Sequence, residues 1–331
     1  MDNRSGKELV TCDVIIPFYG EVKYLIECID SIKNQNLNNL RLNVVVVNDN
    51  PQIAIPDFKD STNIKVSIIN NEQNLGLTKN WNKCLNLREN KYFHLLHYDD
   101  LLEQNFYNKI INDFFDKNDV GMVICKWKNK YENRLSTRYW RSKLKDDEIA
   151  ENLIVLEKGD SAIKGVMLAS FVCSSVLLTK SAIDNSGIFR EDLEYSTDEE
   201  YWARVAKNNN VLISNQKLVL YRSHSGNYAL QTWTQEKFAD LFVKTRLERL
   251  YQLSIVSESD LEREYEVIAL TFINISYKLS LNNENKWAKY YLEKAKEVHP
   301  NIVNNRHYNS ISKIAQRHSF LNIFEKLRKA H

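Results

Sequence analysis

A regular alternation of short apolar runs with helical segments, between residues 12 and 125, restricts the fold more than any other feature of this sequence. The apolar runs are rich in Val, Ile and Leu, and their length and composition are typical of buried strands. Strands that alternate with helices predict an α/β fold with a mostly parallel central sheet flanked by helices. The expected strands are 12–17, 42–47, 64–69, 92–96 and 120–125, and the expected helices are 21–34, 78–87 and 105–115.

Polar-rich segments follow four of these strands at the point where each strand ends: 18–21, 48–50, 70–74 and the pair Asp99 and Asp100. The carboxyl ends of parallel strands meet at one edge of the sheet, so these segments predict a cleft of nucleotide size. The sequence has no GxGxxG and no GxxxxGK[ST], which argues against a dinucleotide fingerprint and a P-loop.

The stretch YFHLLHYDD, residues 92–100, ends in two adjacent carboxylates. Two aspartates at a sheet edge repel each other unless a cation lies between them, so we predict a divalent metal here. The alternative is a polar loop whose aspartates cap the next helix.

The composition is that of an ordinary globular protein, with 43% hydrophobic residues, 27% charged residues and a net charge of +2. This charge gives no bulk attraction to nucleic acid. Five widely spaced cysteines without a CxxC pair argue against a disulfide framework or a structural zinc site. We see neither the apolar core of a signal peptide nor a run long enough to span a bilayer, and we expect a cytoplasmic protein.

A basic segment with interleaved aromatic residues, 126–145, could bind nucleic acid. The same pattern is typical of a hairpin with solvated lysines, which we favour because the chain as a whole is not basic. A substrate-facing role for one of its arginines stays open.

The following part of the chain predicts strands at 170–178, 211–213 and 218–221 and a helix at 196–207. Ser196 with Glu199 and Thr197 with Glu200 both fit a capping box at the start of this helix. Asp198 lies in the first helical turn, where an acid favours the helix dipole whatever its function.

From Trp233 onward only helical periodicity remains, and we expect three to five helices. The tail, 311–331, is basic and amphipathic. Such a helix can lie on an anionic membrane as a peripheral contact, or it can pack on its own domain. We favour packing on its own domain. The C-terminal helices could also form a homo-oligomer.

Six segments in order resemble the motifs of family 2 glycosyltransferases. VIIPFYGEVKYLIECIDSIKNQ resembles their opening VIIPxYNxxxxLxxxLxSIxxQ, VVVNDN their second strand and NEQNLGLTKNWNKCL their NxGxxxAxN segment. LLHYDDLL resembles their DxD-type metal motif, STDEEYWARVA their ED-type acceptor segment and YRSHSGN their RxHxxN segment. The resemblance spans 12–227 and implies a GT-A fold, with a nucleotide-sugar-binding catalytic domain over 9–230 and a helical C-terminal region over 231–331.

The resemblance also implies the reaction, which is transfer of a sugar, of the hexosyltransferase type, from a nucleotide sugar with inversion at the anomeric carbon. It favours UDP donors. Asp49 matches the aspartate that contacts the uracil ring, although turn formation before Pro51 is an equal alternative on the residues alone. The residues implied to bind substrate are Pro17, Phe18, Tyr19, Glu21, Asp49, Asn74, Gly76, Asn82, Asp99 and Trp202.

Mn²⁺ or Mg²⁺ is the implied cofactor, with Asp100 and His224 as ligands and Asp99 shared between metal and substrate. His97 stands where the family often has its first acid. Asp198 matches the catalytic base. Glu199 is the alternative base, because Thr197 replaces the glutamate that usually precedes the aspartate.

The implied acceptor is a hydroxyl of a glycan or lipid-linked glycan in bacterial surface-polysaccharide assembly, such as O-antigen or capsule. Rival hypotheses are a nucleotidyltransferase and a catalytically inactive GT-A-like glycan-binding or scaffolding module. The NxG segment and the DEEYW helix argue against the first. The joint presence of Asp99, Asp100, Asp198 and His224 argues against the second.

Overall fold

A computed structural model of the 331-residue chain describes residues 9–115, 118–131, 153–169, 171–224 and 232–313. The chain divides into two compact units, Met1–His224 and Ser225–His331. The domain boundary predicted after residue 230 lies outside the described residues and stays a prediction.

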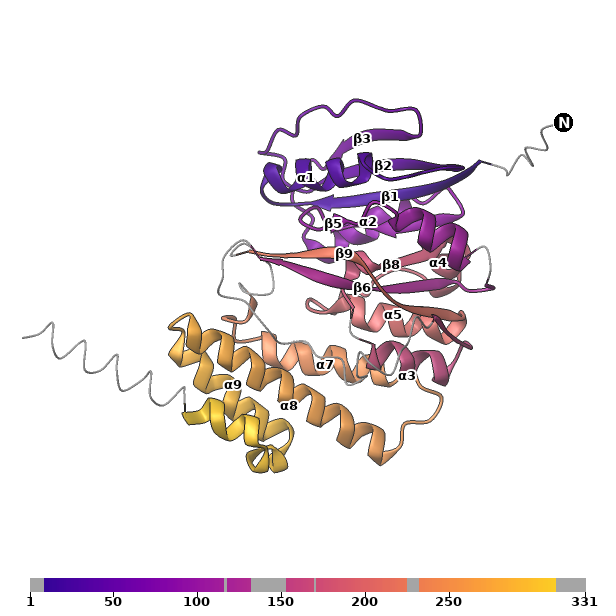
Figure 1. The fold of residues 1–331 in the computed structure, drawn as a ribbon. Helices are drawn as coiled ribbons and strands as arrows, with labels where there is room; N and C mark the ends of the chain where they lie inside the picture. The colour runs from indigo at the N-terminus through magenta and orange to yellow at the C-terminus, as the bar shows by residue number, and fades with distance from the viewer. Residues whose placement is uncertain (1–8, 116–117, 132–152, 170, 225–231, 314–331) are drawn as a thin grey trace, which may run out of the picture. The chain divides into compact units, whose positions relative to one another are not determined.

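The first unit is built around a nine-stranded sheet (Figure 1). Its strands are β1 (Val10–Phe18), β2 (Leu40–Asn48), β3 (Ile64–Asn70), β4 (Tyr92–Leu95), β5 (Leu101–Leu102), β6 (Met122–Tyr131), β7 (Leu153–Leu156), β8 (Val176–Thr179) and β9 (Val211–Ser223). They lie in the order β3-β2-β1-β4-β8-β6-β9-β5, and β7 pairs with β9.

The sheet has a parallel half and a mixed half. In the first half β1 pairs in parallel with both β2 and β4, and β2 pairs in parallel with β3. In the second half β8 is antiparallel to β4 and to β6, while β6 and β9 are parallel. The predicted α/β class with a central sheet flanked by helices is confirmed.

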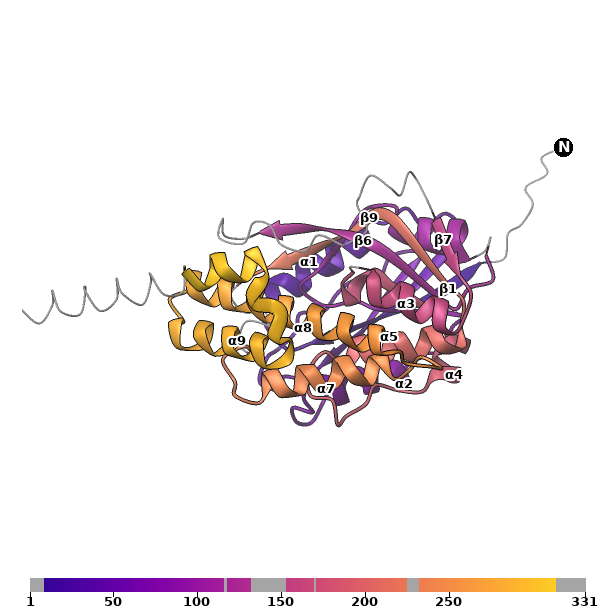
Figure 2. The ribbon, with the colours of Figure 1, turned by 90° about the horizontal axis from the view of Figure 1, so that it is seen from below.

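Helices pack on this sheet and on one another. Alternate residues of β1, among them Val14 and Ile16, join one core cluster with the apolar side of α1 and with the segment before β6. Helix α2 packs against β1 and β4, and α3 packs against α5 (Figure 2). The helices are α1 (Val22–Lys33), α2 (Leu77–Asn86), α3 (Asp160–Leu168), α4 (Lys180–Ser186) and α5 (Thr197–Asn208), with a π-helix η1 (Asn108–Phe115) and a 3-10 turn η2 (Cys173–Ser175).

Several predictions about the second half of the sheet are wrong. The strand expected over 170–178 begins only at Val176, after η2. The two strands expected between 211 and 221 are one strand, β9, whose register with β6 shifts around Lys126 and so accommodates the polar residues in its middle. Residues 126–131 continue β6 and pair with β9, and the rest of 126–145 lies outside the described residues. The short strands β5 and β7 and helix α3 were not predicted.

The second unit contains α7 (Phe238–Leu250), α8 (Glu258–Leu281), α9 (Asn285–Val298) and a 3-10 helix η3 (Pro300–Asn304), followed by helical residues 306–313. Ser257 and Asp260 form a capping box that starts α8. Glu264 binds two buried arginines of α7, Arg246 and Arg249, and so ties α7 to α8. Within the described part of the chain, no helix is both long and apolar enough to cross a membrane. Most of the basic tail lies outside that part.

Candidate active site

The turn after β4, residues 97–100, carries the carboxylates of the predicted metal motif; we call it the metal loop. Its backbone closes through a hydrogen bond from Asp100 N–H to the His97 carbonyl. One ligand atom from each of His97, Asp99 and Asp100 lies within 4.8 Å of the other two. This spacing suits a single divalent cation shared by the three side chains.

Asp100 is fully buried, and both of its carboxylate oxygens accept hydrogen bonds. Ser174 Oγ donates to Oδ2 over 2.5 Å, and the backbone N–H of Arg222 donates to Oδ1 over 3.0 Å. Burial and, next, the charge of Asp99 raise the pKa of Asp100 well above its usual value. A cation beside the two carboxylates would favour the ionised form instead.

His97 Nε2 is buried and has no hydrogen-bond partner among the described residues. Its ring lies 5.2 Å from that of Trp81, and burial lowers the pKa of His97, which favours the neutral imidazole that binds metals. An unpartnered buried polar atom costs free energy that a bound cation would offset. Two carboxylates suit a hard divalent cation such as Mn²⁺ or Mg²⁺, and the imidazole nitrogen is the third donor at the same place.

His224 and Arg222, at the end of β9, both reach the metal loop. His224 Nε2 lies 3.0 Å from Asp99 Oδ2. The buried Arg222 guanidinium donates to the Asp99 carbonyl over 2.8 Å and to Glu27 Oε2 over 2.6 Å, and it lies over the ring of Tyr24. These contacts join β9, α1 and the metal loop, so the predicted ligands Asp99, Asp100 and His224 lie together.

Asp49 lies at the end of β2 and is 2% exposed. Its Oδ1 accepts hydrogen bonds from Asn71 Nδ2 at 2.7 Å and from Leu75 N–H at 2.8 Å, and its Oδ2 accepts one from Gly76 N–H at 3.0 Å. Gly76 has φ +82°, which glycine adopts without strain, and Asn74 Oδ1 also accepts from its N–H. Asp49 therefore organises the turn that starts α2, and its predicted contact with a uracil ring stays a prediction.

The predicted nucleoside-binding residues at the end of β1 differ in exposure. Pro17 and Phe18 are buried, whereas Tyr19 and Glu21 are exposed. The Phe18 ring meets that of Tyr98, in the metal loop, edge to face at 5.1 Å. The ends of β1 and β4 are thus adjacent, as the parallel arrangement predicts.

Asp198 lies half-buried in the first turn of α5, where the helix dipole favours its ionised form. Both predicted capping boxes are wrong: Thr197 already belongs to the helix, and the residue before it, Ser196, has a left-handed backbone (φ +53°) and makes no side-chain capping hydrogen bond, while its carbonyl accepts from Glu199 N–H. Burial and then the charges of Asp198 and Asp100 raise the pKa of the Cys173 thiol.

Two predicted substrate-binding residues, Asn82 and Trp202, are buried in the packing around Phe189. Asn82 Nδ2 donates to the Phe189 carbonyl over 3.0 Å, and its Oδ1 accepts from the Phe189 N–H over 2.8 Å. Trp202 is 2% exposed and packs against Phe189 and Tyr201. The predicted role of Asn82 and Trp202 in substrate binding stays a prediction.

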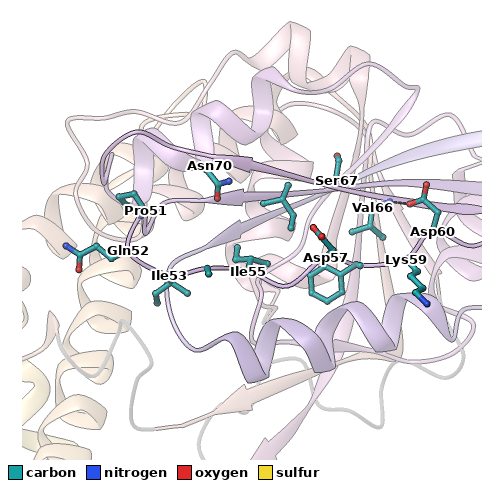
Figure 3. Close-up of a pocket in the computed structure, with 13 residues that line it drawn as sticks. Pro51, Gln52, Ile53, Ile55, Asp57, Lys59, Asp60, Val66, Ser67 and Asn70 are labelled. Atoms are coloured by element: carbon teal, nitrogen blue, oxygen red, sulfur yellow. Dashed lines mark hydrogen bonds between the residues drawn. The ribbon is translucent and has the colours of Figure 1, made fainter.

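A cavity of about 1000 Å³ lies at the β3 edge of the sheet, between that strand and residues 51–60 (Figure 3). Its lining includes Asp57, Lys59 and Ser67, and Asn70 at the end of β3. None of the aspartates of the metal loop lines it. The cavity and the carboxylate cluster are therefore separate features of the described first unit.

The sequence pattern of Glycosyl transferase family 2 matches residues 13–182. The chain belongs to this family. The family predicted from the motifs is therefore confirmed. An uncharacterized glycosyltransferase of Haemophilus influenzae is 23% identical to this family 2 chain over 238 residues, which are 68% of each protein.

Solved structures show the fold of the family 2 chain. S. aureus TarS 1-349 in complex with UDP-GlcNAc superposes with a TM-score of 0.56 and 17% identity, over 97% of this chain and 92% of that one. The mannosyltransferase PcManGT from Pyrobaculum calidifontis, in complex with GDP-Man and Mn²⁺, gives a TM-score of 0.51 and 12% identity, over 97% and 89%. The predicted GT-A fold is confirmed.

Two residues of the candidate site of this glycosyltransferase were missed by sequence reasoning. Ser174 lies in η2, inside a segment interpreted only as a strand, and Arg222 belongs to a motif from which only the histidine was given a role. Both contact Asp100 across more than 70 residues of sequence. A serine interrupting an apolar run was the available signal for Ser174.

Proposed function

We propose that this glycosyltransferase transfers a hexose from a UDP-linked sugar to a hydroxyl of a glycan or lipid-linked glycan, with inversion at the anomeric carbon. The observation that carries the proposal is the gathering of His97, Asp99 and Asp100 after β4, where His224 from the end of β9 contacts Asp99. TarS, which has the same fold, is known in complex with UDP-GlcNAc.

His97, Asp99, Asp100 and His224 would hold Mn²⁺ or Mg²⁺. When bound, the ion supplies positive charge to the diphosphate of the donor and to the leaving group. PcManGT, with the same fold, is known in complex with Mn²⁺. The protein's own contribution is to keep the ligand atoms of His97, Asp99 and Asp100 within 4.8 Å of one another, with His224 beside Asp99 and with two hydrogen bonds that orient Asp100.

Asp198 is the proposed general base. It accepts the proton of the acceptor hydroxyl while that oxygen forms a bond to the anomeric carbon and the bond from this carbon to the diphosphate oxygen breaks on the opposite face. A carboxylate with a usual pKa of about 3.9 is ionised at neutral pH and can accept this proton as the new bond forms. The reaction takes place in the cytoplasm during polysaccharide synthesis, on this proposal.

The direct test is a thermal-shift screen of nucleotides and UDP-sugars with Mn²⁺, followed by UDP-release assays on the donors that raise the melting temperature. We expect Asp198→Asn to lower transfer by about 100-fold or more and to leave UDP binding unchanged. Normal turnover by this variant would refute the assignment of the base.

Glu199→Gln is the matched control, since it removes the neighbouring carboxylate from the same helical turn. We expect its transfer rate to stay within about threefold of the wild type, because Asp198 supplies the base. A large loss in Glu199→Gln with little loss in Asp198→Asn would move the role to Glu199.

A further inference from the structure

The segment that leads to Asp198, residues 187–196, has no regular secondary structure, yet side chains bind its backbone at successive positions. Tyr201 Oη donates to the Gly187 carbonyl over 3.0 Å, and Arg204 Nη2 donates to the Ile188 carbonyl over 2.8 Å. Both donors belong to α5, as does Thr197, whose Oγ1 donates to the Arg190 carbonyl. These hydrogen bonds therefore join helix α5 to this segment.

Asn82 holds the same segment from a different element, α2. It is 5% exposed and binds Phe189 at two points: Nδ2 donates to the carbonyl at 3.0 Å and Oδ1 accepts from the N–H at 2.8 Å. Nδ2 also lies 3.3 Å from Glu191 Oε1. Both amide hydrogens of Asn82 are thus engaged within the protein.

Helix α2 is itself fixed to the metal side of the site. Gly76, the residue just before it, donates its N–H to Asp49, and the helix packs against β1 and β4. Trp81, next to Asn82, places its ring 5.2 Å from that of His97 and 5.3 Å from that of Phe189. The pair Trp81 and Asn82 therefore connects the metal loop to the segment that carries Asp198.

We propose that Asn82 is a positioning residue that sets the place of Asp198 relative to the metal loop, and that it does not bind the donor. The proposal rests on the function proposed for Asp198. Loss of the two hydrogen bonds to Phe189 would let α5 and Asp198 shift, and displacement of a reacting group by about 1 Å costs up to about 100-fold in rate.

The test compares Asn82→Asp, Asn82→Ala and the control Asn86→Ala, an exposed asparagine at the end of the same helix. Asn82→Asp keeps the shape and the acceptor for the Phe189 N–H, but turns a carboxylate oxygen toward the Phe189 carbonyl and Glu191. Hydrogen exchange should become about tenfold faster in peptides covering 187–196 in both Asn82 variants, and stay unchanged in peptides covering 92–102.

Measurements of UDP binding and of turnover distinguish a positioning role of Asn82 from donor binding and from a purely structural role. We expect the Kd for UDP with Mn²⁺ to stay within about twofold of the wild type, while kcat for UDP release from an accepted UDP-sugar falls about 10- to 100-fold. Asn86→Ala should match the wild type in each assay.

Weaker UDP binding with a normal kcat would overturn the proposal in favour of donor binding. A lower melting temperature with normal exchange at 187–196 and normal kcat per UDP-binding site would overturn it in favour of a purely structural role. The exchange experiment needs no substrate, so unchanged exchange in Asn82→Ala overturns the proposal whether or not a donor is known. If the wild type turns over no UDP-sugar, that result counts against the proposed function and not against the role of Asn82.

Discussion

Strands β2 and β4 lie on either side of β1, and each delivers one buried aspartate, Asp49 or Asp100, to the same edge of the sheet, but the surroundings of these two carboxylates differ. Asp49 after β2 accepts hydrogen bonds from two backbone N–H groups and one amide, all of them neutral. Asp99 and Asp100 after β4 have ligand atoms within 4.8 Å of each other, and burial together with the charge of Asp99 raises the pKa of Asp100. Neutral donors of the protein stabilise the Asp49 carboxylate, which therefore has a structural role. A cation would stabilise the like-charge pair Asp99 and Asp100.

The largest expected effect comes from removing one member of the pair Asp99 and Asp100. Asp100→Ala should abolish the Mn²⁺-dependent part of UDP affinity and lower transfer by about a thousandfold, because a metal ion supplies several kcal/mol of charge stabilisation. Calorimetry with UDP, with and without Mn²⁺, measures the first effect. Asp57→Ala, an exposed aspartate at the separate cavity, is the control and should bind as the wild type does. Unchanged affinity of Asp100→Ala in both conditions would place the metal elsewhere.

The next effect is on stability without metal. Asp49→Asn should lower the free energy of unfolding by about 2–3 kcal/mol, because it turns an amide toward backbone N–H groups that need acceptors. Asp100→Asn should lower the free energy of unfolding in EDTA by less than Asp49→Asn does, since the loss of repulsion from Asp99 offsets part of the cost to the hydrogen bonds from Ser174 and Arg222. Urea denaturation in EDTA measures both. Losses of equal size in the two variants would erase the difference between the two strand ends.

A smaller effect depends on pH and concerns His94, inside β4. Its ring is fully buried between Tyr107 Oη and the Ser174 carbonyl, and burial lowers its pKa to about 3. His94 takes up a proton near pH 6.5 in the unfolded chain but only near pH 3 in the folded chain. The stability that neutral His94 contributes is therefore fully present above pH 6.5 and is lost as the pH falls toward 3.

Between these two pKa values, His94 alone makes the free energy of unfolding rise with pH by up to about 1.4 kcal/mol per pH unit. Unfolding of the wild type and of His94→Gln, compared between pH 7 and pH 4.5, isolates it, because the other titrating groups are common to both proteins. A difference in unfolding free energy that stays constant with pH would show that His94 has the same pKa in the folded and the unfolded chain.

Elements that depend on local pattern were predictable from the sequence. The strand over residues 92–95 and the helix that contains Asn82 were predicted to within one or two residues, since period and length distinguish them. The pairing of strands was not predictable: β8 lies between β4 and β6 although it follows β4 by some 80 residues, because hydrogen-bond partners are chosen by packing across the whole sheet. The capping box failed for the same reason, since tertiary contacts of the segment before α5 set the backbone of Ser196.

The sequence by itself determined the α/β class, the family and the aspartates at the strand ends, because apolar periodicity and short motifs are local properties of the chain. Tertiary structure alone decided which of these groups are stabilised by other protein groups. Asp49 binds the turn that starts α2, Asn82 holds the segment before Asp198, and Ser174 and Arg222 orient Asp100. Each of these contacts joins residues far apart in sequence, and the donors and acceptors meet only when the sheet and its helices have packed.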